Sequence, residues 1–335
     1  MRFSEHTNRN CRRAFTMLDV LISLSIIGLL FGLLLPSIQQ AREIARILEC
    51  ANNLRQFGLS AEQHVAIHRR FSYTSTQWYD GVKQHKAISP HRYLMAALDP
   101  QVFSQINFDD PTSASWTSIP VFAAANNQKL SAQSLAVLNC PSDQTYPGSN
   151  SYRASLGISV ELLPSRGNME SDSQRGAFVN GRAVAPAEFT HGLSNTVLFS
   201  ERVTGDFKPT VYEPFRDVFA GTDLNGYRTT ADMESRCRAS ATVNPASHYS
   251  WQGASWLLGG YSNTWFNHVR VPNSRDPDCA AGRSWTDGGP SIIAARSLHS
   301  DGVNSLFGDG SSRFISFNID QSVWRALGTR TGSPD

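Results

Sequence analysis

The sequence predicts an α+β protein in which one long N-terminal helix packs on a β-rich, antiparallel globular head. Three features lead to this prediction. An apolar run of bilayer length comes first, a helical repeat of apolar residues follows it without a turn signal, and the remainder combines short apolar runs with many Ser, Asn, Thr and Gly residues. The chain accordingly divides into a basic leader, an apolar helix, an amphipathic helical stem and a head, at residues 1–14, 15–38, 39–70 and 71–335.

The charge of the chain is small and unevenly distributed. Of its 335 residues 17% are charged, and the formal net charge is +2. The leader holds four arginines and one glutamate, a charge of +3, which leaves −1 for the rest of the chain. Because no basic field remains to attract nucleic acid, we expect no nucleic-acid partner. The composition is typical of an exported β-rich domain.

The apolar run from Phe15 to Ile38 has the length of a membrane span. No charged residue lies between Val20 and Leu35. As a helix, Met17–Leu35 would be about 29 Å long, close to the hydrocarbon thickness of a bilayer. Since arginines precede the run, we expect a cytoplasmic N-terminus, a single pass through the inner (cytoplasmic) membrane and an extracytoplasmic head.

Three kinds of export signal are compatible with a basic leader and an apolar run. An ordinary secretory signal has an apolar region of about 7–15 residues that ends in an A-x-A-like site, whereas this run is longer and lacks such a site. A twin-arginine signal would use Arg12-Arg13, but that motif is short and this apolar run is unusually strong for it. A type IV prepilin signal fits the residues better.

The leader and helix, RRA–FTMLD followed by Pro36, resemble the class III leaders of type IV pilins and type II secretion pseudopilins. The resemblance implies that a prepilin peptidase/methyltransferase cuts between Ala14 and Phe15 and methylates the new amine. Ala14 stands where glycine is usual and Asp19 where glutamate is usual. We therefore expect processing that is slower but not abolished.

Asp19 needs a partner inside the membrane. A carboxylate near the bilayer core costs about 2.5–3.5 kcal/mol on insertion scales. After cleavage the Phe15 amine would be that partner, either in the same chain or on the preceding subunit of a filament. In the alternative, the helix is a plain membrane anchor and the Asp19 side chain extends to the membrane interface. We favour the assembly role for Asp19.

The stem continues the apolar helix as an amphipathic one. Apolar or small residues recur at three- and four-residue steps, and charged residues lie between them; the repeat comprises Ile44, Ile47, Leu48, Ala51, Leu54, Gly58, Ala61 and Val65. Pro36 lacks an N–H and should kink this helix without ending it. A helix from Phe15 to about Ile67 would be about 80 Å long.

The stem and three later segments resemble the DUF1559 family of prepilin-like proteins. The matching sequences are PSIQQAREIARILECANNLRQFGLSAEQH (36–64), CPSD (140–143), LSNTVLFSE (193–201) and the H-x9-DG signature formed by His299, Asp309 and Gly310. The resemblance implies a type IV pilin-like fold. We interpret Asp309-Gly310 as a tight hairpin turn and His299 as a structural hydrogen-bonding residue. A metal ion shared by His299 and Asp309 is not expected, because the extended chain between them approaches about 33 Å.

Four cysteines remain once Cys11 in the leader is set aside, namely Cys50, Cys140, Cys237 and Cys279. In an exported chain they permit two disulfides in three connectivities. The pairs nearest in sequence, Cys50–Cys140 and Cys237–Cys279, are favoured, and four reduced, buried thiols are the alternative. None of the cysteines shows zinc-ligand spacing, so we expect no metal site and no cofactor.

Further candidate residues have a functional and a structural interpretation. Asp143 follows a Pro-Ser turn and is either a cation ligand or a turn acceptor. Glu201 ends an apolar strand and is either a functional acid or an acceptor in a buried network. Residues 248–270 are rich in aromatic side chains that would form either a sugar-stacking face or part of a β-rich core, and we favour the core. His191 occupies a position where the family commonly has Asp.

These features together predict a membrane-tethered structural subunit. We expect it to be processed before Phe15 and to assemble with like or related pilin subunits into a type IV pilus-like or type II secretion pseudopilus-like filament. The alternative is a tethered extracytoplasmic binding module for polysaccharide or another surface ligand. The sequence contains no G-x-S-x-G motif, no H-E-x-x-H motif and no phosphate-binding glycine loop, and we expect no enzymatic activity.

Overall fold

The protein is described by a computed structural model that covers residues 17–75, 78–79, 84–85, 87–108, 127–131, 133–160, 175–221, 229–243, 248–281 and 290–332. The predicted cleavage site at Ala14 and Phe15 lies outside these residues. The chain forms two compact units, residues 1–45 and 46–335.

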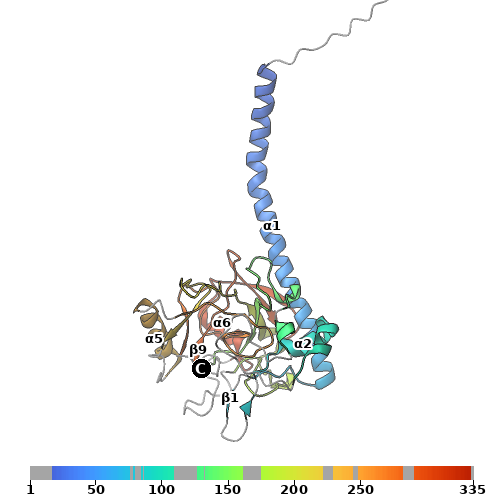
Figure 1. Ribbon diagram of the computed structural model, residues 1–335, viewed down its shortest axis with the longest axis vertical. Helices are drawn as coiled ribbons and strands as arrows, with labels where there is room; N and C mark the ends of the chain where they lie inside the picture. The colour runs from blue at the N-terminus through green and yellow to red at the C-terminus, as the bar shows by residue number, and fades with distance from the viewer. Residues whose placement is uncertain are drawn as a thin grey trace, which may run out of the picture. The chain divides into compact units, whose positions relative to one another are not determined.

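The predicted long helix is present as α1, Met17–His68, and it continues through Pro36 (Figure 1). At 1.5 Å per residue its 52 residues extend about 78 Å. In the first unit the apolar side chains of α1 are exposed, Met17 by 84% and Leu33 by 69%. Ser23 and Ser25 donate their hydroxyls to backbone carbonyls one turn earlier, at 2.7 Å each, so these two polar groups are satisfied within the helix.

The stem part of α1 packs into the head from Cys50 onwards. Its buried residues recur every three or four positions: Cys50, Ala51, Asn53, Leu54, Phe57, Gly58, Ser60 and Ala61. The predicted apolar face is therefore confirmed in its later part. The sequence pattern also assigns Ile44 and Leu48 to that face, but they are exposed by 58% and 59%. Leu48 lies on the side of the helix that also carries the exposed residues Asn52, Arg55 and Leu59.

The head is β-rich, as predicted, and its larger sheet has five strands. In the order β11-β10-β4-β3-β7 they span Ser312–Ser316, Gly302–Phe307, Val197–Glu201, Tyr152–Ser155 and Trp265–Phe266. A four-stranded sheet has the order β6-β5-β8-β9, with His248–Tyr249, Val218–Gly221, Asp278–Ala281 and Ser291–Ile292. A third sheet pairs β1, Trp78–Tyr79, with β2, Gln84–His85.

The two larger sheets are mixed, which corrects the expectation of an antiparallel head. Strand β3 pairs with β7 in parallel, and β5 pairs with β8 in parallel. Parallel pairing needs a long crossover, and both pairs are joined by more than a dozen residues. The hairpin predicted around Asp309-Gly310 is confirmed, since β10 and β11 pair antiparallel in unbroken register from Gly302↔Ser316 to Leu306↔Ser312.

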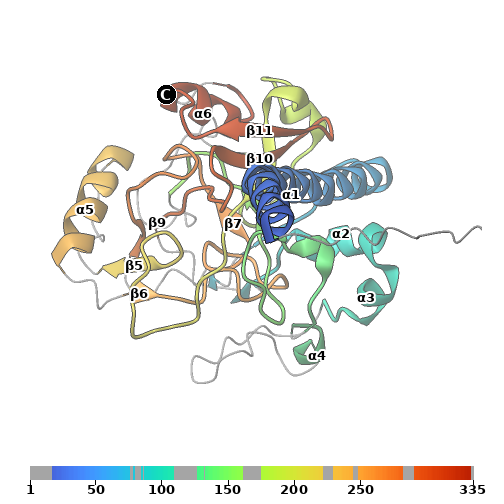
Figure 2. The ribbon, with the colours of Figure 1, turned by 90° about the horizontal axis from the view of Figure 1, so that it is seen from above.

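Short helices surround the sheets. They are α2 (His91–Leu98), α3 (Pro100–Gln105), α4 (Gln128–Ser131), the 3-10 helices η1 (Ala136–Leu138), η4 (Pro186–Glu188) and η5 (Leu193–Asn195), then α5 (Thr230–Val243) and α6 (Gln321–Gly328). Helix α5 and the α2–α3 pair lie at opposite sides of the head (Figure 2). Asp320 caps α6, because its carboxylate accepts hydrogen bonds from the N–H groups of Ser322 and Val323.

The main core of the head contains stem residues and aromatic side chains. Phe57 of the stem makes edge contacts with the rings of His91, Tyr152 and Phe199, with centroids 5.3–5.6 Å apart. A second, smaller cluster surrounds Cys237 and Cys279. The stem is therefore part of the core of the head and contributes to its stability.

Candidate functional site: the stem–head junction

The residues that carry the family resemblance meet where the stem contacts the strands and loops of the head. We call this contact, between residues 46–68 of α1 and the rest of the head, the stem–head junction. A disulfide joins Cys50 of the stem to Cys140 in the turn that precedes β3. A second disulfide joins Cys237 of α5 to Cys279 of β8. Both pairs are those favoured by nearness in sequence.

Buried polar groups lie directly beside the Cys50–Cys140 disulfide. The Oε2 atom of Glu201 accepts a hydrogen bond from the backbone N–H of Asn304 at 2.7 Å, and its Oε1 atom accepts from the Asn304 side chain at 3.0 Å. The same amide donates to the carbonyl of Ile47 on the stem at 3.3 Å. Glu201 is thus an acceptor in a buried network, which is the structural interpretation of this acid.

His299 is buried in the same place. Its Nε2 atom lies 3.4 Å from Oε1 of Glu201 and 3.6 Å from Sγ of Cys140. The signature histidine therefore contacts the residues that attach the stem, whereas Asp309 lies in the hairpin turn at the other end of β10.

The Asp309-Gly310 turn also packs on the stem, at the other end of β10 from His299. Gly310 has φ +78°, a conformation that favours glycine, and Asp309 accepts hydrogen bonds from the N–H and hydroxyl of Ser311. A Cβ atom built on Gly58 of the stem would lie 3.1 Å from Cα of Gly310, so the helix and the turn approach closely. Beside this contact is a cavity of about 300 Å³, lined by stem residues such as Val65 and by the turn.

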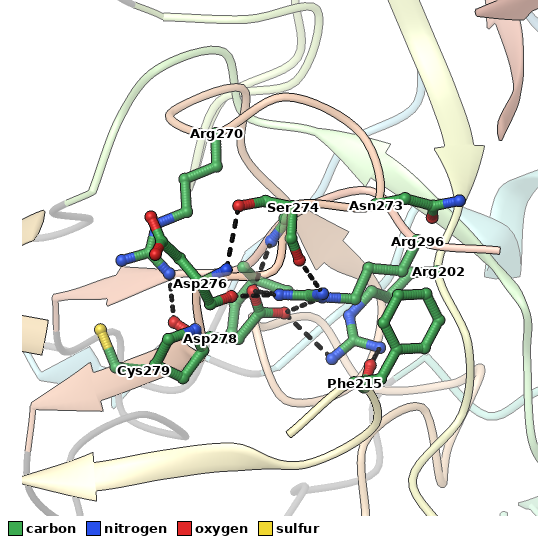
Figure 3. Close-up of polar contacts among 12 residues, drawn as sticks. Arg202, Phe215, Arg270, Asn273, Ser274, Asp276, Asp278, Cys279 and Arg296 are labelled. Carbon is green, nitrogen blue, oxygen red and sulfur yellow. Dashed lines mark hydrogen bonds and ion pairs between the residues drawn. The ribbon is translucent and has the colours of Figure 1, made fainter. Parts of the chain in front are cut away.

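A network of buried charges surrounds Asp278 at the start of β8 in the four-stranded sheet (Figure 3). Asp278 of β8 accepts from Arg202 at 3.0 Å and from Arg296 at 2.9 Å. All three side chains are buried, and the Arg296 guanidinium also lies over the Phe215 ring, 5.1 Å from its centroid. Arg296 further donates to the carbonyls of Ser274 and Asp276, which fixes the loop before β8.

Burial and opposite charges shift the pKa values in this network in identifiable directions. Burial lowers the pKa of Arg202 to about 10, although the charge of Asp278 opposes this shift. Burial raises the pKa of Asp278, but the charges of Arg296 and Arg202 outweigh burial and hold it below its ordinary value. Asp278 and Arg202 are therefore ionised at neutral pH.

Asp143 is a turn residue that also joins distant loops. It accepts from Arg216 at 2.8 Å and from the backbone N–H of Thr204 at 2.7 Å. With these donors it serves as an acceptor that connects the CPSD turn to the segment after β4. The cation-ligand interpretation has no support from this arrangement.

The aromatic segment lies largely in the core. Trp256, Tyr261, Trp265 and Phe266 are fully buried, whereas Tyr249 and Trp251 are partly exposed. Trp265 donates from its indole N–H to the hydroxyl of Thr74 at 2.8 Å. Four of the six rings are therefore buried and cannot stack on a sugar, which favours the core interpretation over a sugar-stacking face.

The remaining predicted site residues lie in α1. Asp19 is exposed in the first described turn, and Pro36 lies within the helix. Sequence reasoning missed Asn304, Arg202, Asp278 and Arg296. Asn304 and Arg296 interrupt apolar runs, whereas Arg202 and Asp278 stand among other polar residues, and neither pattern identifies a partner.

Helix α1 is long and apolar enough to cross a membrane. Its most apolar 18-residue window has a mean hydropathy of 2.5, and none of that window is buried in the protein. The described part of the chain is therefore consistent with single-pass membrane anchoring through the N-terminal helix.

Comparison with known proteins gives a family match through the stem and the head. Neither the curated proteins nor the solved structures contain a match. Residues 39–322 match the family described as "Protein of unknown function (DUF1559)". This match covers most of the chain and includes the stem, both cysteines of the Cys50–Cys140 disulfide and the H-x9-DG signature. The chain belongs to the DUF1559 family.

Proposed function

We propose that this protein is a prepilin-like structural subunit, held in the inner membrane by α1 with its head outside the cytoplasm, and that it assembles into a type IV pilus-like or pseudopilus-like filament. The observation that carries the proposal is the exposed apolar half of α1. From Met17 to Leu35 its large apolar side chains are exposed. Such a surface requires a membrane or other helices.

Asp19 distinguishes an assembly helix from a plain anchor. A plain anchor gains nothing from a carboxylate near its N-terminus, where insertion costs free energy. A mature N-terminal amine at Phe15 would lie four residues away, one helical turn, and could neutralise that carboxylate within a chain or between neighbouring chains. The role we propose is structural, with prepilin peptidase/methyltransferase and related pilin subunits as partners.

The first test is the N-terminus of the mature protein, measured by mass spectrometry of protein isolated from membranes. We expect a chain that begins at methylated Phe15. A chain that still begins at Met1, or one cut after the apolar run, would overturn the prepilin assignment.

The second test is Asp19→Ala, with Asp19→Glu as the matched control. We expect Asp19→Ala to abolish filament incorporation while the head stays folded, and Asp19→Glu to keep incorporation because it retains the carboxylate. The readout is cysteine crosslinking between neighbouring α1 helices in membranes, alongside near-ultraviolet circular dichroism of the head. Equal crosslinking in the alanine and glutamate variants would contradict the proposed charge pairing.

A further inference from the structure

Four side chains with metal-binding atoms converge at the stem–head junction. They are Cys50, Cys140, Glu201 and His299, and all four are buried. One ligand atom from each lies within 4.8 Å of all the others. We propose that, when the Cys50–Cys140 disulfide is reduced, these four side chains bind one Zn²⁺ ion. This proposal is independent of filament assembly.

The donor set is one that zinc prefers. Structural zinc sites are tetrahedral and take cysteine thiolates and histidine nitrogens, and carboxylate oxygens also serve as ligands. Spacing along the chain, at positions 50, 140, 201 and 299, resembles no zinc motif, and only the fold brings the four residues together. Each comes from a different one of the segments that resemble the family.

The separations already match those between ligands of one ion. With Zn–S of about 2.3 Å and Zn–N or Zn–O of about 2.1 Å at a tetrahedral angle, sulfur and nitrogen would lie about 3.6 Å apart and nitrogen and oxygen about 3.4 Å. The observed distances from His299 Nε2 are 3.6 Å to Cys140 Sγ and 3.4 Å to Glu201 Oε1. The histidine and the carboxylate therefore need little movement.

The surroundings orient the ligands and balance their charge. Asn304 holds both carboxylate oxygens of Glu201, as outer residues do around metal-binding carboxylates. Two thiolates and one carboxylate around Zn²⁺ leave a net charge of −1. A small cavity of about 10 Å³, bordered by Cys140 and Glu201, is also lined by Arg202 and Arg296, whose positive charges would offset it.

Reduction of the Cys50–Cys140 disulfide needs two electrons. A phosphine reductant attacks one sulfur, the S–S bond breaks, and water supplies the oxygen of the phosphine oxide and the two protons of the thiols. Zinc binding then releases two protons as two thiolates form. In a cell a dithiol oxidoreductase would take the place of the phosphine and would itself be oxidised to a disulfide.

The second disulfide provides a matched control. Among the residues that the structure describes, Cys237 and Cys279 belong to no such group of metal-binding side chains. The experiment uses the full chain in detergent, reduced with a phosphine, loaded with Zn²⁺ or Co²⁺ and desalted. The readouts are bound metal per chain and the thiolate-to-cobalt charge-transfer absorption.

We expect one equivalent of metal in the wild type and in the Cys237→Ser/Cys279→Ser variant. Cys50→Ser/Cys140→Ser should lose the charge-transfer band, and His299→Gln should weaken binding at least tenfold. Metal binding that persists without Cys50 and Cys140, or that disappears with Cys237 and Cys279, would overturn the proposal.

Reduction alone could unfold the head, so the disulfide is also reduced with Zn²⁺ already present and folding is followed by near-ultraviolet circular dichroism. The proposal requires a folded head that holds one Zn²⁺ under these conditions. A reduced head that is folded but binds no metal, or one that unfolds with and without Zn²⁺, would sink it.

Discussion

At the scale of single residues, Asp278 is a buried carboxylate that pairs with two arginines. It faces Arg202 and Arg296, and all three side chains are removed from water. Removing one partner of a buried ion pair leaves the other charge unpaired, which costs far more than the intact pair contributes. Two guanidiniums depend on this one carboxylate.

Asp278→Asn should therefore lower the free energy of unfolding of the head by about 3–5 kcal/mol. The matched control is Asp232→Asn, because Asp232 pairs with Arg236 on the exposed surface of α5 and the change should cost about 0.5 kcal/mol. Both values come from chemical denaturation of the full chain in detergent. Equal losses in the two variants would show that the buried network is not energetically special.

Two buried histidines should make the head acid-sensitive. Burial lowers the pKa of His91 to about 4 and that of His268 to about 3. In the unfolded chain a histidine binds a proton below about pH 6.5, whereas in the folded head these two stay neutral, so stability falls as the pH drops through 6.5. At pH 5 each histidine should cost roughly 2 kcal/mol.

His268→Gln removes one of these contributions. The loss of unfolding free energy between pH 7 and pH 5 should shrink by roughly 2 kcal/mol relative to the wild type. Asp217, whose pKa burial raises to about 6, acts in the opposite direction but is common to both proteins. An unchanged pH dependence in the variant would contradict the neutral, buried state of His268.

At the scale of elements, the junction between the stem and the β10–β11 hairpin depends on small residues. A Cβ atom on Gly58 would approach both Leu306 and Gly310 at 3.0–3.1 Å. In contrast, Gly28 and Gly32 in the apolar half of the same helix have nothing within 4 Å. Gly58 is therefore required for close packing of the stem on the hairpin, whereas there is room for a larger side chain at Gly28 and Gly32.

Gly58→Val should lower the unfolding free energy of the head by about 1–3 kcal/mol through overpacking against the hairpin. Gly32→Val introduces the same residue into the same helix and should leave the stability of the head unchanged. Thermal unfolding of both variants in detergent gives the comparison. A destabilised head in the Gly32 variant would show that helix propensity, and not packing, is responsible.

Several elements could be predicted because their signals are local. The helix from Met17 to His68 and the hairpin turn at Asp309-Gly310 each depend on residues a few positions apart. Parallel pairing of β3 with β7 could not be predicted, since those strands lie more than a hundred residues apart. The exposure of Leu48 likewise depends on which side of the stem the head covers.

At the scale of the whole molecule, one helix belongs to both compact units. Its first part offers an uncovered apolar surface, and its second part lies in the core of the head. The candidate site shows the same limit of prediction. The signature histidine and the cysteines could be identified from motifs, but their meeting with Glu201 and Asn304 depends on the fold of the entire head.

The disulfide between Cys50 and Cys140 has a mechanical consequence. Tension applied to the stem reaches the head through a covalent bond at the first buried position of the helix, before any packed side chain must carry load. Peeling the stem out of the head would therefore have to break a bond or unravel the β-sheet, and packing contacts alone would not set the rupture force. In a subunit that is pulled through its helix, this bond would determine whether the stem stays packed in the head.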